Sequence, residues 1–495
     1  MGLQIDRDTF DADDEERFAL RLRHCLTALD TVLARPGFGE GPTRIGMELE
    51  LSLVDASGRP LMRNEEVLSA CRVPRMAVEL DRFNVEYNSL PRPVAGAPFT
   101  TLATEVREAL TGVGEAAAEY GGRVAAVGIL PTLEERDLQR DALTDQPRFR
   151  ALSSRIRQLR QAPFRVRLDG RELIDITCDD VTLEGANTSL QVHLQVTPAQ
   201  FARAYNAAQI ATGPVLAVCG NSPILAGRLG WEETRVALFR QAVDDRGPTA
   251  SWRPARVSFG HGWVRNGPAE LFAESVALHA PLLPVCGDED PLWAVGNGHL
   301  PELAELRLHH GTVWRWNRAV YDPDGAGSVR LEMRALPAGP TVRDMLANVA
   351  FLVGLTAALS REVQWMTAAL PFRFAEHNFI QAARAGMDAT LLWPAHRAPS
   401  PRPVHIGELI HDLLPVADAG LALLDVDPDE RRTHLTVIEE RVGRGVTGAR
   451  WQRDTMRAAE LRMGRSRALA HMLDRYLDLA VTDEPVHTWP MPAER

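Results

Sequence analysis

The chain has 495 residues and a formal net charge of −11, and it contains no lysine, so all 55 of its Lys and Arg residues are arginine. This absence excludes a Walker A phosphate loop, a Schiff-base enzyme and a protein-kinase site, because each of these needs a lysine. The acidic balance argues against a nucleic-acid partner, and no apolar run reaches the ~20 residues of a membrane span. We therefore expect neither a nucleic-acid partner nor a membrane.

The N-terminus and the cysteines indicate where the protein works. The first residues are acidic and lack the apolar core of a secretory signal. The five cysteines lie far apart, form no CxxC pair and are odd in number, so they predict neither a zinc clip nor a disulfide framework. We expect reduced thiols in a cytoplasmic protein, and the sequence leaves a homo-oligomer open.

Taken in chain order, the hydrophobic pattern predicts a mixture of helices and strands. Helices are expected at 13–34, 101–120, 197–220 and 341–370, and strands at 43–55, 76–91, 123–130, 187–196 and 327–336. From Pro371 the chain is mostly helical, with a Pro-rich joint at 393–404. Alternating rather than solidly apolar strands favour an α+β fold with an antiparallel sheet. We divide the chain into an N-terminal helical segment (1–42), a catalytic domain (43–370) and a helical C-terminal extension (371–495).

Four of the expected strands have one apolar face and one polar face, because residues i and i+2 of a strand point the same way. The polar sets are Glu48 and Glu50; Glu86 and Asn88; Gln191, His193 and Gln195; and Arg330, Glu332 and Arg334. Any half-exposed antiparallel strand alternates like this, but strand surfaces are depleted in Glu and Asn. Oxygen ligands with one histidine suit Mg²⁺ or Mn²⁺, and divalent ions beside arginines suit a nucleoside triphosphate.

Five motifs in order, over roughly Arg44 to Leu355, resemble the glutamate–cysteine ligases, in particular the carboxylate–amine ligase group. They are GMELE at 46–50, VELDRFNVEYN at 78–88, SLQVHLQV at 189–196, GNSPILAGRLGWEETRVALF at 220–239 and VRLEMRALPAGPT at 329–341. The resemblance implies a glutamine synthetase-like fold, in which a curved antiparallel sheet forms a funnel with helices outside. It also implies ATP and Mg²⁺ or Mn²⁺ on the polar face of that sheet.

The same resemblance implies roles for individual residues. As metal ligands it implies Glu48, Glu50, Glu79, Glu86, His193 and Glu332. As nucleotide contacts it implies Arg330, Arg334 and Asn88, and as substrate contacts Arg235, Gln191 and Arg318. As catalytic residues it implies Arg334, which reaches phosphate, and Glu50 and Glu86, either of which could accept the proton of the attacking amine.

The implied reaction joins a carboxylate to an amine at the expense of ATP. A carboxylate, taken to be the γ-carboxylate of glutamate, attacks the γ-phosphate, and an amine such as cysteine then takes the acyl group. A carboxylate is a poor electrophile and needs this activation, and phosphoryl transfer needs its negative charge neutralised. Three alternatives stay open: glutamate joined to a different amine, a nucleotide- and metal-binding protein without ligase activity, and a phosphotransferase like the guanidino kinases.

Other chemistry-bearing residues have ordinary structural explanations. Trp314, Trp316 and Arg318 alternate, which fits a strand edge beside the nucleotide or core packing. His309 and His310 are expected to be loop histidines, because no second ligand has the right spacing. The arginine-rich segment 441–476 is interrupted by acidic residues, so we expect an amphipathic packing helix there.

Overall fold

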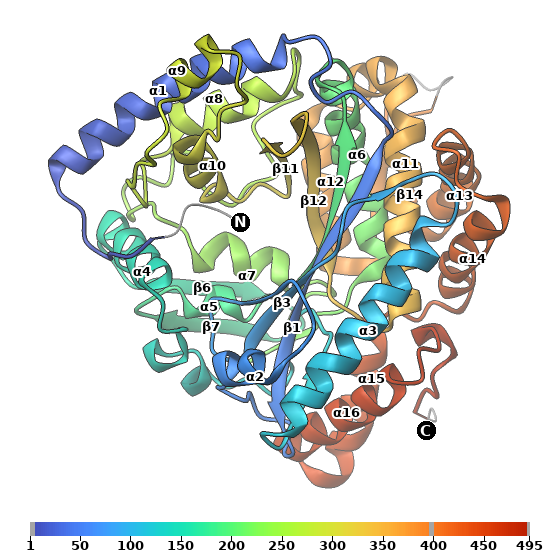
Figure 1. The fold of residues 1–495 in the computed structure, drawn as a ribbon. Coiled ribbons are helices and arrows are strands. Elements are labelled where there is room, and N and C mark those ends of the chain that lie inside the picture. Colours follow the sequence, from blue (N-terminus) through green and yellow to red (C-terminus); the bar gives the residue numbers. More distant parts are fainter. Residues whose placement is uncertain (1–4, 396–399, 493–495) are drawn as a thin grey trace.

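The computed structural model describes residues 5–395 and 400–492, and an eight-stranded sheet lies at its centre (Figure 1). The strand order is β11-β12-β8-β1-β3-β2, with β4 and β5 also paired to β1, and every pair is antiparallel. The strands are β1 (Arg44–Asp55), β2 (Met76–Val78), β3 (Asn84–Asn88), β4 (Arg92–Pro93), β5 (Gly122–Ala125), β8 (Ser189–Val196), β11 (Asn317–Asp322) and β12 (Ser328–Pro337). The sheet curls into a half-barrel, which confirms the predicted α+β fold.

One face of this sheet is a hydrophobic core. Met47, Leu49 and Leu51 of β1 are at most 2% exposed, and so are Leu331 and Met333 of β12. Helices α6 (Pro198–Cys219) and α11 (Val342–Ala369) pack on this side. The side chain of Thr341 caps α11 by accepting from the Asp344 N–H, whereas Thr197 before α6 makes no such bond. The alternation read from the sequence therefore separates a core face from a polar face.

Helix α11 is long and apolar enough to cross a membrane by length and composition alone. Its most apolar 18-residue stretch is 83% buried inside the protein. Packing against α6, α13 (Ile406–Ala422) and α14 (Pro428–Arg444) accounts for that apolarity.

The chain does not stay extended between Met76 and Asn88, where one continuous stretch was predicted. It forms β2, reverses, and returns as β3, with the Asn84 N–H donating to the Asp81 carbonyl at 2.8 Å. The prediction was wrong because Leu80 and Phe83 in the turn are as apolar as strand residues. The reversal matters for the site, since it places Glu79 at the end of β2 beside the strand that carries Glu86.

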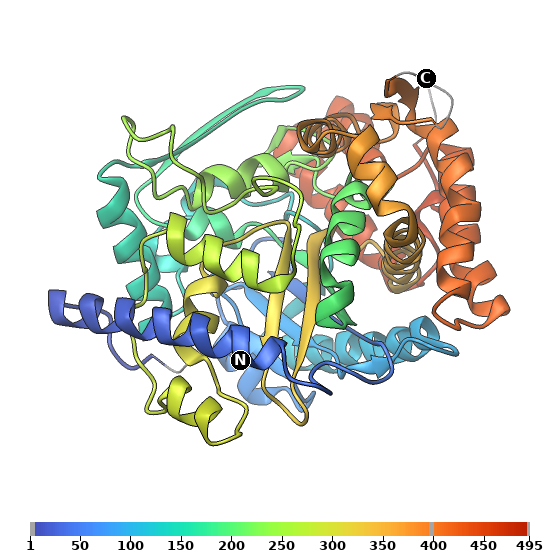
Figure 2. The ribbon, with the colours of Figure 1, turned by 90° about the horizontal axis from the view of Figure 1, so that it is seen from above.

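The first helix, α1 (Ala12–Leu33), begins at a capping box formed by Asp11 and Asp14. It packs against three short helices: α8 (Pro268–Leu278), α9 (Pro291–Gly296) and α10 (Ala304–Gly311). In Figure 2, α1 (dark blue) and the C-terminal helices (orange and red) lie on opposite sides of strands β11 and β12.

The C-terminal region is helical, as predicted. Its helices are α12 (Phe372–Ala385), α13, α14, α15 (Gly448–Met463) and α16 (Arg465–Ala480). Strands β13 (Thr390–Trp393) and β14 (Arg402–His405) flank the Pro-rich joint, of which residues 396–399 lie outside the described residues. Trp451 and Tyr476 share a core with Val54 and Ala125 of the sheet. The arginine-rich segment 441–476 packs on this core, but as the end of α14, α15 and most of α16 rather than as one amphipathic helix. The domain boundary expected after residue 370 crosses this common core.

Several elements had no counterpart in the sequence prediction. Among them are α2 (Asn64–Ala70), α4 (Pro147–Arg160), β6 (Phe164–Asp169), β7 (Leu173–Cys178), α5 (Thr182–Gly185), β9 (Ile224–Leu225) and β10 (Arg228–Leu229). Helix α7 (Arg235–Ala242) follows the turn of the 220–239 motif and carries Arg235 at its start. The predicted helix at 101–120 is α3 (Pro98–Ala118), and the predicted strand at 123–130 ends early, at Ala125. The short α5 and α7 are the ones that bear on the site described below.

Candidate active site

Strand register brings most of the predicted residues onto one polar face. His193 lies opposite both Gly46 and Glu332, and Glu332 lies opposite Arg318. On the other side of β1, Glu48 lies opposite Asn88 and Glu50 opposite Glu86. The side chains therefore come from five adjacent strands, β11, β12, β8, β1 and β3. The face divides into a half where arginines neutralise the carboxylates and a half where they do not.

The neutralised half is centred on Glu332, which is 1% exposed. Arg318 holds it with two guanidinium nitrogens, Nε at 3.0 Å from Oε2 and Nη2 at 2.9 Å from Oε1. Arg334 donates to the same carboxylate and also to Gln191. Burial opposes ionisation of Glu332, but the two guanidinium charges outweigh it and hold its pKa well below the ordinary value.

A second chain of polar contacts runs through His193. Its Nδ1 accepts from Arg330 Nε at 3.0 Å, and Arg330 Nη1 also donates to Asp322 at 2.7 Å. Because an arginine can only donate, a neutral His193 ring carries its proton on Nε2, which lies 3.0 Å from Glu48 Oε1. Nε2 makes no hydrogen bond in spite of this short distance, and ligating a metal through Nε2 would require Arg330 to release Nδ1.

The other half of the face gathers carboxyl groups around Glu50, Glu79 and Glu86. Burial, followed by the charge of Glu50, raises the pKa of Glu79 to about 7. Burial and the charges of its acidic neighbours raise the pKa of Glu86 well above its usual range. Burial also raises the pKa of Glu50, although Arg334 opposes the shift. These groups form a site of excess negative charge.

Glu184, on the short helix α5, joins this acidic half and was missed from the sequence. Burial and the charges of Glu79 and Glu50 raise its pKa to about 8. The residue lies in a four-residue helix with no apolar period, so no sequence pattern indicated it.

Two amides hold these carboxylates in place. Gln191 Nε2 donates to Glu50 at 2.8 Å, and the backbone N–H of Ser189 donates to the other oxygen at 2.7 Å. Asn88 Nδ2 donates to Glu86 at 2.6 Å. Gln191 therefore connects Arg334 with Glu50, so the two halves of the face are one hydrogen-bonded unit. Substrate contact by Gln191 and nucleotide contact by Asn88 and Arg330 stay predictions.

In the part of the chain that the structure describes, no three His, Cys, Asp or Glu side chains are grouped so as to hold a metal ion. In the neutralised half, the carboxylates are not free to form such a group, because Glu48 faces His193 and Glu332 faces two arginines. The acidic half nevertheless fits a divalent cation by its chemistry, because it offers several hard oxygen donors with too little positive charge among them. The predicted ligand set stays a prediction.

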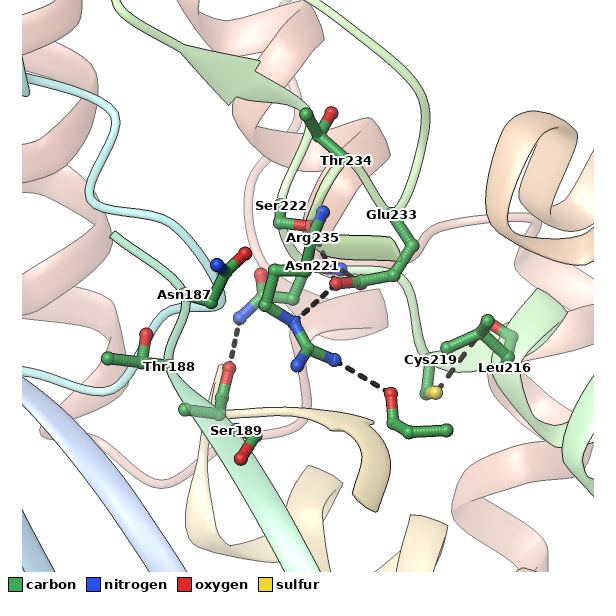
Figure 3. Close-up of polar contacts among 12 residues, drawn as sticks. Asn187, Thr188, Ser189, Leu216, Cys219, Asn221, Ser222, Glu233, Thr234 and Arg235 are labelled. Carbon is green, nitrogen blue, oxygen red and sulfur yellow. Dashed lines mark hydrogen bonds and ion pairs between the residues drawn. The ribbon is translucent and has the colours of Figure 1, made fainter. Parts of the chain in front are cut away.

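Arg235, the predicted substrate contact on α7, is 2% exposed and already has protein partners (Figure 3). Its Nε lies 2.6 Å from Glu233, and its Nη2 donates to the carbonyl of Ala335 at 2.7 Å. Two of its nitrogens are therefore engaged by protein groups, whereas a substrate contact implies nitrogens free to bind a ligand.

The remaining candidate residues are buried in packing contacts. Trp316 is 2% exposed and packs on Phe239 and Phe379, so core packing is the explanation that holds for it. His309 and His310 are buried in α10, so the prediction that they lie in a loop was wrong. Ring contacts with Phe18 and Phe272 explain their burial.

The family model described as "Glutamate-cysteine ligase family 2 (GCS2)" matches residues 44–470. The fold resembles a glutamate–cysteine ligase from Francisella tularensis, solved in complex with AMP, at a TM-score of 0.54 and 9% identity, covering 92% of this chain and 91% of that one. It also resembles a bifunctional glutathione synthetase from Pasteurella multocida at a TM-score of 0.49 and 11% identity, covering 94% of this chain and 55% of that one. No curated protein sequence matches the chain.

Proposed function

The chain belongs to glutamate–cysteine ligase family 2, and from this membership we propose that it is an ATP-dependent carboxylate–amine ligase. The observation that carries the proposal is the polar face itself, where Arg318, Arg334 and Glu332 lie on the same sheet as the acidic half at Glu50 and Glu86. Arginines and acid-held cations are the two means of neutralising phosphate that a chain without lysine has.

Glutamate and cysteine are the proposed substrates. An oxygen of the γ-carboxylate attacks the γ-phosphorus, the bond to ADP breaks, and a γ-glutamyl phosphate forms. The amine nitrogen then attacks the acyl carbon, and phosphate leaves with the oxygen that glutamate supplied. The amine loses one proton in forming the amide.

The residues of the polar face would carry these steps. Arg334 would stabilise the negative charge of the transferring phosphoryl group, and Arg318 would hold the Glu332 carboxylate in place beside it. Either Glu50 or Glu86 would accept the proton that the attacking amine loses. The network from Gln191 to both halves of the face would keep the carboxylate and the phosphate in line.

ATP and Mg²⁺ or Mn²⁺ are the proposed cofactors. A divalent cation, when bound, neutralises phosphate oxygens and draws them towards the acidic half. Glu50, Glu79, Glu86 and Glu184 would hold it there. Burial raises the pKa of each of them, and acidic neighbours raise those of Glu79, Glu86 and Glu184 further. The acceptor amine rests on family membership alone, and the proposed cytoplasmic location rests on the pattern of the cysteines.

The test is to incubate the protein with ATP, Mg²⁺ and glutamate, to add single amino acids and amines in turn, and to measure ADP together with product mass. A γ-glutamyl amide with one ADP per product is expected, and cysteine should give the highest kcat/KM. A different preferred amine would keep the ligase and change its substrate. Tight ATP binding with no ADP for any acceptor would contradict the proposal, and a phosphorylated product that persists would indicate a kinase.

A further inference from the structure

Strand β12 carries one extra residue at the point where it supplies Arg334. The pairing of β12 with β8 is regular from Val329 to Met333 and resumes, shifted by one, at Leu336 opposite Leu190. Arg334 and Ala335 therefore both stand opposite Gln191. Such a β-bulge bends its strand and re-aims a side chain, and it leaves backbone groups without partners in the ladder.

The Ala335 carbonyl in this bulge is held by Arg235. Nη2 of Arg235 donates to it at 2.7 Å, from a residue one hundred positions away in the sequence. Both residues are buried, Arg235 at 2% exposure and Ala335 at 3%. A buried carbonyl without a partner would be costly, so this bond favours the bulged form of the strand over the regular one.

Arg235 is itself fixed by a fully buried carboxylate, that of Glu233 (Figure 3). Glu233 Oε1 accepts from Arg235 Nε at 2.6 Å and from the Ser222 hydroxyl at 2.6 Å, and Oε2 accepts from the Asn221 N–H at 2.9 Å. Both carboxylate oxygens are thus engaged. The turn at Asn221 and Ser222, in the motif that marks this family resemblance, serves to anchor one guanidinium.

These contacts also occupy one of the two edges with which a guanidinium can bind a carboxylate. That edge presents Nε and one terminal nitrogen as parallel donors, and the other edge presents the two terminal nitrogens. In Arg235 the two nitrogens of the first edge already donate to Glu233 and Ala335. By contrast, the neighbouring Arg334 on the bulge lies at the centre of the polar face, bonded to Glu332 and Gln191.

We infer that Arg235 is a positioning residue, which holds the β12 bulge through the Ala335 carbonyl and thereby sets where Arg334 stands in the site. The inference deepens the proposed function, on which its catalytic part rests. Loss of Arg235 moves Arg334 while leaving every other group of the polar face present.

Hydrogen exchange tests the structural part without any activity. In the free protein, Arg235→Gln and Glu233→Gln should each speed amide exchange in peptides covering Ser328–Pro337, while exchange in α11 stays unchanged. A guanidinium that serves only the substrate would leave β12 exchange as in the wild type, and that result would overturn the inference whether or not the protein proves to be a ligase.

Steady-state kinetics test the catalytic part. Arg235→Gln should lower kcat about 100-fold, the order expected from a misplacement of about 1 Å, with the KM for the carboxylate substrate within about threefold of wild type. In an Arg334→Lys background the same change should add less than about threefold, because the two residues act through one group. A large rise in KM with normal kcat, or fully multiplicative effects, would show that Arg235 contacts the substrate directly.

The matched control is Arg256→Gln, which also removes a buried guanidinium. Arg256 is 0% exposed and is bonded to Asp245 at 2.6 Å and to the Ala280 carbonyl at 2.5 Å. It should lower the melting temperature while β12 exchange and kcat remain as in the wild type. If Arg256→Gln reproduces both effects of Arg235→Gln, the effects come from general destabilisation and the inference fails.

Discussion

Arg318 and Glu332 face each other across neighbouring strands, and the guanidinium meets the carboxylate at three donor–acceptor distances between 2.8 and 3.0 Å. The acid is almost wholly enclosed, with 1% side-chain exposure, and the arginine has 15%. Removing one partner would leave a buried charge without its main neutralising group.

We predict that Arg318→Met destabilises the protein by about 3–5 kcal/mol, as expected for breaking a buried ion pair. Urea denaturation of the two proteins measures this difference. The matched control is Arg432→Met, which breaks an ion pair with Asp429 whose side chains are 71% and 86% exposed. The control should leave the urea midpoint unchanged, and equal effects from the two variants would contradict the central place of the Arg318–Glu332 pair.

The effect of removing a carboxylate from the acidic half on the melting temperature should depend on whether a divalent cation is present. In EDTA, Glu86→Gln should raise the melting temperature, because it removes one of several carboxylates that repel each other. With Mg²⁺ or Mn²⁺ present at the same ionic strength, the wild type should gain melting temperature and Glu86→Gln should gain much less. Thermal scans with NaCl as the ionic control measure this. Equal gains for both proteins would place cation binding elsewhere.

Activity should depend on the neutralised half of the face. Glu332→Gln and Glu48→Gln are each expected to lower kcat/KM by at least about 100-fold, because each removes a charge that orients the phosphate-handling groups. Circular dichroism shows whether the variants fold. Near-normal turnover of both folded variants would move the active site away from this sheet.

We predict that the buried His309 contributes to the loss of folding stability at acid pH. Burial lowers its pKa to about 4, and its Nε2 lies 3.0 Å from the Ser275 carbonyl, while Nδ1 has no partner. An unfolded histidine titrates near 6.5. Between pH 6.5 and about 4 the unfolded state therefore binds more protons, so this residue makes stability fall as pH falls through that window.

Urea unfolding at several pH values tests this sign. His309→Gln should flatten the pH dependence of unfolding free energy between pH 6.5 and 4, and exposed His299→Gln should leave it unchanged. A steeper dependence in His309→Gln would contradict the assignment of a neutral buried ring.

The C-terminal helices are predicted to unfold with the sheet. Trp451 is 0% exposed and packs on Trp489, with ring centroids 5.1 Å apart. Trp451→Ala should cost about 3–5 kcal/mol and shift a single cooperative transition seen by every probe. Leu461→Ala, at a position 86% exposed, should shift nothing. Two separate transitions would instead support an independent domain after residue 370.

Features that follow from the alternation of side chains along a strand could be predicted from the sequence. Features that depend on contacts between distant segments could not. Glu48, Glu50 and Glu332 could be placed on one face because side chains of a strand alternate. The β2–β3 reversal could not, since Leu80 and Phe83 in the turn are as apolar as the strands around them. Glu184 lies in a helix too short to show a pattern, and the partner of Arg235 is a carbonyl freed by a bulge, which only the strand register reveals.

The central claim is that a substrate carboxylate is activated by ATP as an acyl phosphate. The most direct measurement uses glutamate labelled with ¹⁸O in its γ-carboxylate, with ATP, Mg²⁺ and the preferred amine, and follows the label by mass spectrometry. The account predicts one ¹⁸O in each inorganic phosphate released, because phosphate leaves with the oxygen that attacked the γ-phosphorus. Unlabelled phosphate formed together with the amide product would contradict it.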